Sequence, residues 1–232
     1  MNLAQFTPGS ALITVVLIAL APFFAVMVTS FTKIAVVLSL VRNALGLQQV
    51  PPNLVLNGLA LILTVFVMYP TLEKMQVAAA VQGPATPTMP GDPPAQAENP
   101  IESTGDIFAT ADRAKEPLRE FLVKHSDPRE RAFFLRTQQR IGDPAKVSTL
   151  RDTDFVIVIP AFVVKELKLA FQIGFLIFLP FLVIDMVIAN ILLAMGMMML
   201  SPVTISLPFK ILLFVLVDGW VKLSHGLVLS YA

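Results

Sequence analysis

The sequence predicts an all-α membrane protein, built from long bent helical hairpins with a small helical insert between them. Three observations lead to this prediction. Of the 232 residues, 56% are hydrophobic and only 14% are charged, well below the roughly 25% that is typical of soluble domains. The charges are unevenly spread: residues 1–72 hold two, residues 73–154 hold 24 and residues 155–232 hold seven. The two charge-poor flanks contain four apolar blocks, which a soluble domain could not solvate.

The charge distribution divides the chain into three regions. Residues 1–72 are expected to form an N-terminal helical hairpin, and residues 155–232 a C-terminal one. Residues 73–154 form a polar insert. Within it, residues 82–105 hold six prolines and three glycines, a composition that favours a disordered or extended linker because it cannot bury enough surface to offset the cost of ordering.

Two short helices are predicted in the rest of the insert. Apolar residues recur at three- and four-residue steps from Ile107 to Leu122, which is typical of an amphipathic helix. The sequence Asp127-Pro128-Arg129-Glu130 predicts the start of a second helix, with Asp127 as the N-cap and proline at the first helical position. That helix is expected to stop before Gly142.

The two apolar blocks near the N-terminus differ in length relative to the thickness of a membrane. The first, Ala11–Val41, would make a helix of about 46 Å, against a hydrocarbon core of about 30 Å. Either its first half spans and the rest turns back, or the helix bends at Pro22 or at the polar step Thr29–Lys33. The second block, Leu54–Tyr69, is a candidate span that we expect to end at Pro70.

The C-terminal region holds the other two blocks. Residues 155–200 would make about 69 Å of helix, more than twice the membrane thickness, so Pro160 and Pro180 are predicted break points. The last block, 209–223, follows a proline-flanked turn.

Orientation is predicted from the short loops. The connection from Lys33 to Asn53 carries two basic residues and no acidic one, so it should face the cytoplasm. The N-terminus and the polar insert would then lie outside, and the turn at 200–210 inside. The first residues lack a basic n-region, so we expect no cleaved signal peptide.

Composition and motifs also argue against several function classes. The net charge of +1 gives no electrostatic footprint for nucleic acid, and the absence of cysteine excludes thiolate chemistry. The sequence has no phosphate-binding glycine loop and no zinc motif, so we expect no cofactor and no enzymatic activity. Asp185 and Asp218 could form an intramembrane carboxylate pair for peptide hydrolysis, but neither lies in a context that specifies it.

Polar residues in the C-terminal blocks need an explanation, because a charge at the bilayer centre is costly. Asp185 must face protein or water. It could pair with Lys210 between packed helices, or it could line a conduit. We assign Asp185, Asn190, Lys210 and Asp218 to buried polar positions important for assembly.

Met197, Met198 and Met199 form a run between Gly196 and Pro202. Methionine commonly fills irregular space in a core, but three consecutive residues cover about 200° of a helix and cannot share one seam. The flanking residues favour a loop. Several copies of such a loop around an axis would make a soft apolar constriction, which could close against water and ions and still deform around a polypeptide.

Two long motifs resemble the signatures of the FliP/SctR family (YscR, HrcR and SpaP among its members), the export-gate subunits of flagellar and virulence type III secretion. The first motif runs from Pro160 to Gly174, and the second from Pro208 to Trp220. Thr29–Lys33 and Ala44–Asn53 resemble the N-terminal half of the family. The signature residues are Pro160, Ala161, Phe162, Glu166, Leu167, Phe171, Gln172, Gly174, Pro208, Gly219 and Trp220.

The resemblance implies a homopentamer that assembles with a FliQ/SctS-type and a FliR/SctT-type membrane subunit. It implies a closed pseudo-helical pore in the bacterial inner membrane, which works with further export-apparatus proteins and through which unfolded polypeptides are exported. It also implies that Met197, Met198 and Met199 form a gasket inside the pore. The C-terminal sequence Ser224–Tyr231 resembles the injectisome branch more than the flagellar one.

The sequence is also compatible with two other functions. A small-solute or ion transporter subunit would often carry inverted repeats, and no repeat is visible in the sequence. A purely structural scaffold around another pore would have no residues facing a lumen.

Overall fold

The computed structural model describes residues 8–47, 49–80, 104–142 and 149–232, and all regular structure in these residues is helical. The chain forms two compact units. The first comprises residues 1–67 and 159–232, and the second comprises residues 68–158. The prediction of an all-α protein is confirmed.

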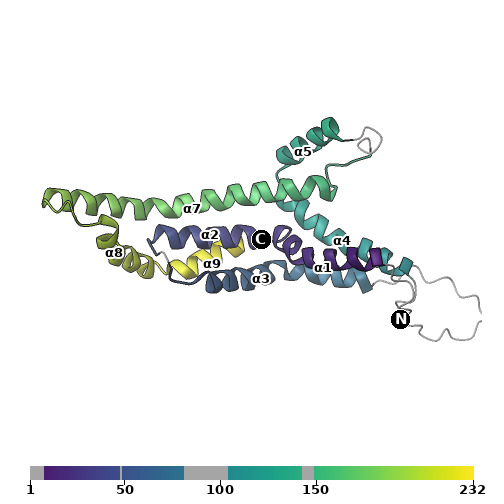
Figure 1. Ribbon diagram of the computed structural model, residues 1–232, viewed down its shortest axis with the longest axis horizontal. Helices are drawn as coiled ribbons and strands as arrows, with labels where there is room; N and C mark the ends of the chain where they lie inside the picture. Colours follow the sequence, from purple (N-terminus) through teal and green to yellow (C-terminus); the bar gives the residue numbers. More distant parts are fainter. Residues whose placement is uncertain (1–7, 48, 81–103, 143–148) are drawn as a thin grey trace, which may run out of the picture. The chain divides into compact units, whose positions relative to one another are not determined.

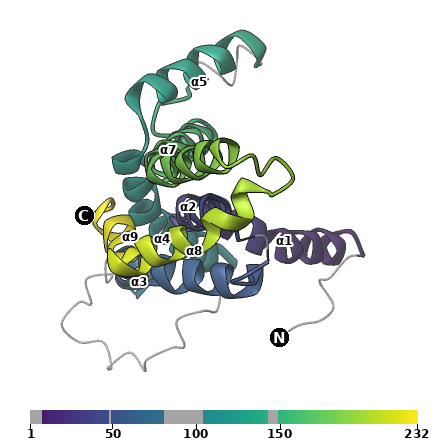
Figure 2. The same ribbon diagram turned by 90° about the vertical axis from the view of Figure 1, so that its left-hand side faces the viewer.

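The helices of the first unit surround α2. This unit contains α1 (Pro8–Met27), α2 (Phe31–Ala44), most of α7 (Phe155–Ala194), α8 (Pro202–Leu216), α9 (Gly219–Leu229) and the beginning of α3 (Asn53–Ala80). In both views α2 lies between α7 on one side and α3 with α9 on the other (Figures 1 and 2).

The core of the first unit is apolar and centred on one stripe of α2. Ile34, Val37, Leu38 and Val41 are at most 1% exposed, and their three- and four-residue spacing places them on one side of a helix. Other helices supply the residues that complete the cluster. These are Leu56 and Ala60 from α3, Ala170 and Phe181 from α7, Phe214 from α8, and Leu223 and Leu227 from α9.

The first apolar block is broken at its polar step. Helix α1 continues through Pro22 and ends at Met27, and α2 begins at Phe31. The Thr32 hydroxyl donates a hydrogen bond to the Val26 carbonyl at 3.1 Å, which satisfies a backbone group that the end of α1 leaves open. Of the alternatives left open by the sequence, the bend at Thr29–Lys33 is the one observed.

Three predicted proline breaks are wrong. Helix α3 continues through Pro70 to Ala80, and α7 runs unbroken through Pro160 and Pro180 for 40 residues, about 60 Å. Proline removes one hydrogen bond from a helix. A full break in so apolar a segment would instead expose several backbone groups that have no partner, and long membrane helices commonly tolerate proline for this reason.

Membrane crossing is possible for two or three segments. By length and composition α3 and α7 could each span a bilayer, and α8 with α9, bent by 59° where they join, could form a third, broken span. Only 11% of the most apolar window of α7 is buried within the chain. Most of that window is therefore left uncovered by the rest of the described chain.

The second unit contains the two predicted insert helices, α4 (Thr104–His125) and α5 (Pro128–Ile141). The Asp127 carboxylate accepts a hydrogen bond from the backbone N–H of Arg129 at 2.9 Å, and the helix stops before Gly142. Both features confirm the prediction from sequence. The linker predicted over residues 82–105 lies outside the described residues, except for Thr104 and Gly105, which begin α4.

Candidate functional site

A buried charged cluster joins three segments of the first unit. The Lys33 ammonium of α2 lies 3.3 Å from the Glu166 carboxylate of α7, and both side chains are 1% exposed. The Tyr231 hydroxyl, just beyond α9, donates a hydrogen bond to Glu166. The Lys33 nitrogen also lies 3.5 Å from the centre of the Tyr231 ring, a cation–π contact. We call Lys33, Glu166 and Tyr231 the closed cluster.

Burial governs the electrostatics of the closed cluster. It lowers the pKa of the Lys33 ammonium, and the neighbouring Glu166 carboxylate opposes that change. Burial and the charge of Glu166 both raise the pKa of the Tyr231 hydroxyl, which therefore stays protonated and acts as a donor. Such a cluster is costly to break, because removing one member leaves a buried charge without its partner.

The closed cluster as a unit was not predicted from the sequence. Lys33 entered there as part of a polar step and as one of two basic residues that set the orientation, and Glu166 as part of a family signature. A usable signal was present, since each is an isolated charge in an apolar block and charges in such blocks usually pair with one another. Nothing in the sequence spacing points to Tyr231.

A second cluster holds the other end of α2. The Lys210 ammonium of α8 lies 2.6 Å from the Asp185 carboxylate of α7, the pairing that the sequence analysis suggested as one alternative. Ser206 also donates a hydrogen bond to Asp185, and Lys210 donates one to the Ala44 carbonyl at 3.4 Å. That carbonyl belongs to the last residue of α2, where a cation is favoured by the helix dipole. We call Asp185, Ser206 and Lys210 the open cluster, because Asp185 is 28% exposed.

Two residues predicted to be buried are exposed in the chain, Asn190 and Asp218. Asn190 follows Asp185 by five residues, which is about 140° around the helix, so it cannot share the packed side of Asp185. Asp218 forms the corner between α8 and α9 with a φ of 52°, a left-handed conformation that aspartate tolerates better than most residues.

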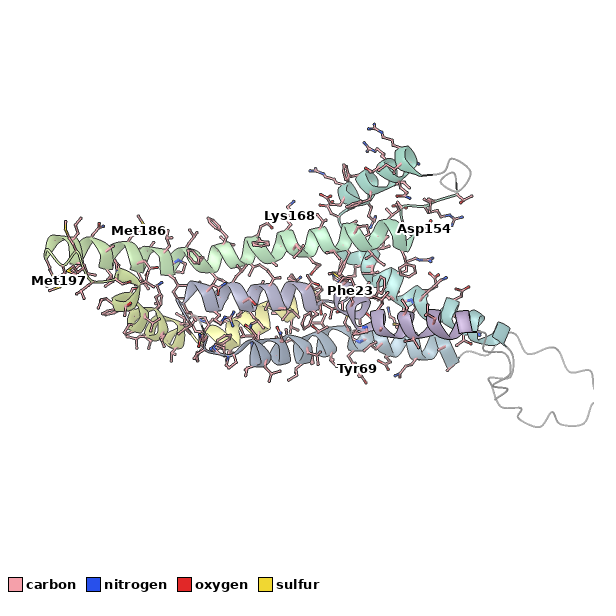
Figure 3. All side chains as sticks on the ribbon, in the orientation of Figure 1. Phe23, Tyr69, Asp154, Lys168, Met186 and Met197 are labelled. Carbon is pink, nitrogen blue, oxygen red and sulfur yellow. The ribbon has the colours of Figure 1, made fainter. Side chains whose placement is uncertain are left out.

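Met197, Met198 and Met199 lie in the turn between α7 and α8. Their exposed fractions are 41%, 81% and 101%, so they do not fill the core of this chain. Figure 3 shows Met197 at the tip of the α7–α8 hairpin. Gly196 begins the turn with a φ of +72°, a conformation that glycine adopts without strain. We call these three residues the methionine turn.

Most signature residues have packing roles in the first unit. Ala161, Phe162 and Glu166 are buried on one side of α7. Gly174 allows the close approach of α2, because a Cβ there would lie 2.3 Å from Leu40 Cδ1.

The second signature packs around the Phe214 ring. A Cβ at Gly219 would lie 2.3 Å from that ring, and Trp220 contacts it edge-on with the ring centres 5.2 Å apart. The remaining signature residues are partly or fully exposed: Pro160, Leu167, Phe171, Gln172 and Pro208.

Comparison with known proteins identifies relatives along nearly the whole chain. The FliP family model matches residues 13–227. The hypersensitivity response secretion protein HrcR of Ralstonia nicotianae is 48% identical over 96% of this chain and 97% of its own length. The Yop proteins translocation protein R of Yersinia pestis is 49% identical, covering 95% and 94% respectively. The flagellar biosynthetic protein FliP of Bacillus subtilis is 44% identical, covering 95% and 90%.

Proposed function

This chain belongs to the FliP family, and from that premise we propose that it is a core subunit of a type III secretion export gate. In this role several copies surround a pore in the bacterial inner membrane, through which unfolded proteins are exported. The subunit is non-enzymatic, so the energy for export comes from other parts of the apparatus. Relatives named for virulence secretion range from 41% to 49% identity, and flagellar FliP is 44% identical. The injectisome branch is therefore proposed on the 48% and 49% identities to the Ralstonia and Yersinia proteins.

The observation that carries this proposal is the exposure of the methionine turn. Three large apolar side chains on one turn are costly to leave in water, and here they stand at the tip of a long helical hairpin with Met199 fully exposed. Brought around one axis by several copies, they form a constriction that excludes water and ions. Methionine is unbranched and flexible, so the same constriction can widen around a polypeptide.

Self-association is supported by the uncovered surface of α7. This helix is about 60 Å long, twice the thickness of the hydrocarbon core, and a single span cannot use its length. Burial against sister copies accounts for the remainder. We propose a homopentamer together with FliQ/SctS-type and FliR/SctT-type subunits, and Asp185, Asn190, Lys210 and Asp218 as residues that shape or contact this assembly.

We propose a topology with the insert on the periplasmic side. Lys33 was counted as a positive charge of a cytoplasmic loop, and in the structure it is not a loop residue. Lys33 lies within α2 and is buried against Glu166. Arg42 remains as the basic residue beside the α2–α3 turn, where its guanidinium donates hydrogen bonds to the Asn53 side chain and the Pro51 carbonyl. The positive charge of this short turn supports a cytoplasmic position.

The seal can be tested by replacing Met197, Met198 and Met199 together with alanine. We expect assembled complexes of this variant to let small ions or dyes leak across the membrane. A control variant replaces Met75 of α3, which lies outside the turn and outside α7, with alanine and should not leak. Unchanged permeability in a fully assembled triple variant would refute the gasket.

A further inference from the structure

Helix α5 of the insert contacts the rest of the second unit through polar interactions of Arg131. None of its fourteen residues is buried. The Arg131 guanidinium donates hydrogen bonds of 2.9 Å to the Val123 carbonyl and to the Ser126 hydroxyl. It also lies 3.6 Å from the Asp152 carboxylate. Phe134 and Leu135 are half-buried, and Arg129, Phe133, Arg136 and Arg140 are exposed.

One exposed side of α5 carries three arginines and one aromatic residue. Arg129, Phe133, Arg136 and Arg140 follow one another at steps of four, three and four residues, which places them on one helix face, and all four are exposed. They line a shallow hollow of about 220 Å³. Figure 3 shows nitrogen-tipped side chains extending outward from α5. We call these four residues the arginine face.

The arginines of this face have no acidic partner within the described part of the chain. Each of the salt bridges there involves other residues. Arginine presents a planar fork of donors that matches a carboxylate. Three such forks in a row, with Phe133 among them, suit an acidic polypeptide segment that also carries apolar groups.

The rest of the insert has the complementary charge. The insert, residues 73–154, holds 13 acidic and 11 basic residues, of which α5 contributes one acid and four arginines. Outside α5 the insert is therefore net negative by five. The whole excess lies in residues 73–112, which we call the acidic half: it has six acids and one base, Lys74. Two of these acids, Glu73 and Asp112, are described and exposed.

We infer that the arginine face of one copy binds the acidic half of the insert of a neighbouring copy. This inference rests on the proposed function, in which identical subunits assemble. It identifies one of the contacts between neighbouring subunits. The contact joins two different surfaces, so it is a head-to-tail interface of the kind that generates rings and helical assemblies.

A membrane surface is the other class of partner for a basic helix. Helices that lie in a membrane interface present a broad apolar face to the lipid. On the arginine face Phe133 is the one large apolar side chain, and Phe134 and Leu135 lie on other sides of the helix and are half-buried. The face therefore favours a polypeptide over lipid.

Charge reversal in two sets of variants tests the inference. The first set changes Arg129→Glu, Arg136→Glu and Arg140→Glu in one chain. The second changes Glu98→Lys, Glu102→Lys, Asp106→Lys and Asp112→Lys in another. Each variant alone turns attraction into repulsion, so we expect association between copies to weaken by about a hundredfold, measured by native mass in detergent.

Co-expression of the two variants should restore association between unlike copies, because each contact between the two variants is again between opposite charges. In a closed ring of five copies at least one contact still joins like variants, so recovery should be partial. A control chain with Lys124→Glu, Lys146→Glu and Arg151→Glu changes three basic residues of the insert outside α5. It carries the same change in net charge as the first variant and should assemble normally. The chain has no cysteine. Copies carrying Arg136→Cys and copies carrying Asp112→Cys should therefore form a disulfide-linked dimer when mixed.

Three results would overturn the inference. Normal assembly of the arginine variant would show that the face makes no contact between copies. Rescue only when both sets of changes lie in one chain would place the contact within a single copy. If the arginine variant lost binding to vesicles of anionic phospholipid, and co-expression with the second variant did not restore its assembly, the arginine face would be a lipid-binding face. Failure of the unmodified chain to assemble would instead refute the proposed function itself.

Discussion

The two ion pairs of the first unit differ in how fully they are enclosed. In the closed cluster Lys33 and Glu166 are each 1% exposed, and Tyr231 covers them. In the open cluster Lys210 is 3% exposed but Asp185 is 28% exposed. The second carboxylate is partly exposed on the surface of the chain, and the first is not. The closed cluster therefore stabilises the packing of α2 against α7. The open cluster leaves the Asp185 carboxylate accessible to solvent or to another chain.

Both clusters attach to the same helix, α2, one at each of its ends. Lys33 lies in the first turn of α2, and Ala44, whose carbonyl accepts from Lys210, is its last residue. The helix at the centre of the core is thus tied at both ends to α7, once through Glu166 and once through Asp185 acting with Lys210. The following substitutions break these ties, in order of decreasing expected effect.

Removal of one charge of the closed cluster should be the most damaging change. Lys33→Met or Glu166→Leu leaves a fully buried charge unpaired, and each should lower the free energy of unfolding by about 3–5 kcal/mol. The double variant should cost much less than the sum, because neither charge remains. Thermal unfolding in detergent measures all three variants. If the double variant lost as much stability as the two single ones added together, the two residues would not act as a pair.

Asp185→Asn in the open cluster should cost less, about 2–3 kcal/mol. The Lys210 ammonium loses its carboxylate but keeps the Ala44 carbonyl and access to water around residue 185. We expect a lower yield of assembled complex, quantified by native mass. Normal assembly with lost secretion would instead assign Asp185 to lining the conduit, and the account of the open cluster as a tie would be wrong.

Tyr231→Phe should have a smaller effect, about 1–2 kcal/mol. The ring still covers Lys33, but the hydroxyl that donates to Glu166 is lost. The change is measured in the same unfolding experiment, with Tyr69→Phe as the control, because Tyr69 is 64% exposed. Equal stability of the two variants would mean that the hydroxyl contributes nothing to the closed cluster.

Ser206→Ala should be the mildest change, about 0.5–1.5 kcal/mol. It removes one donor to Asp185 and leaves the ion pair with Lys210 in place. Its effect should disappear in an Asp185→Asn background if the hydroxyl acts through that carboxylate, which a double-mutant cycle can measure. Additive losses would separate Ser206 from the open cluster.

Features that depend on neighbouring residues were predictable from the sequence. The all-helical character and the capped start of α5 at Asp127 follow from local composition and capping chemistry. The pairing of Asp185 with Lys210 could be suggested because each is an isolated charge in an apolar block and lies near the same turn.

Features that depend on distant packing were not predictable. Lys33 and Glu166 are separated by more than 130 residues, and their pairing exists only because α2 lies against α7. The positions of Pro160 and Pro180 mislead for the same reason: the apolar surroundings of these residues in α7 outweigh the local cost of proline in a helix. Asn190 is exposed in the chain, so its predicted role in assembly depends on contacts with other chains.

The mass of the native complex in detergent tests the central claim most directly, for the chain alone and with the FliQ/SctS-type and FliR/SctT-type subunits co-expressed. The chain has a mass of 25.3 kDa, and the proposed homopentamer predicts a discrete species containing about five copies. Association of some kind is expected because the most apolar window of α7 is only 11% buried within the chain. A stable, folded species of 25.3 kDa under both conditions would contradict it.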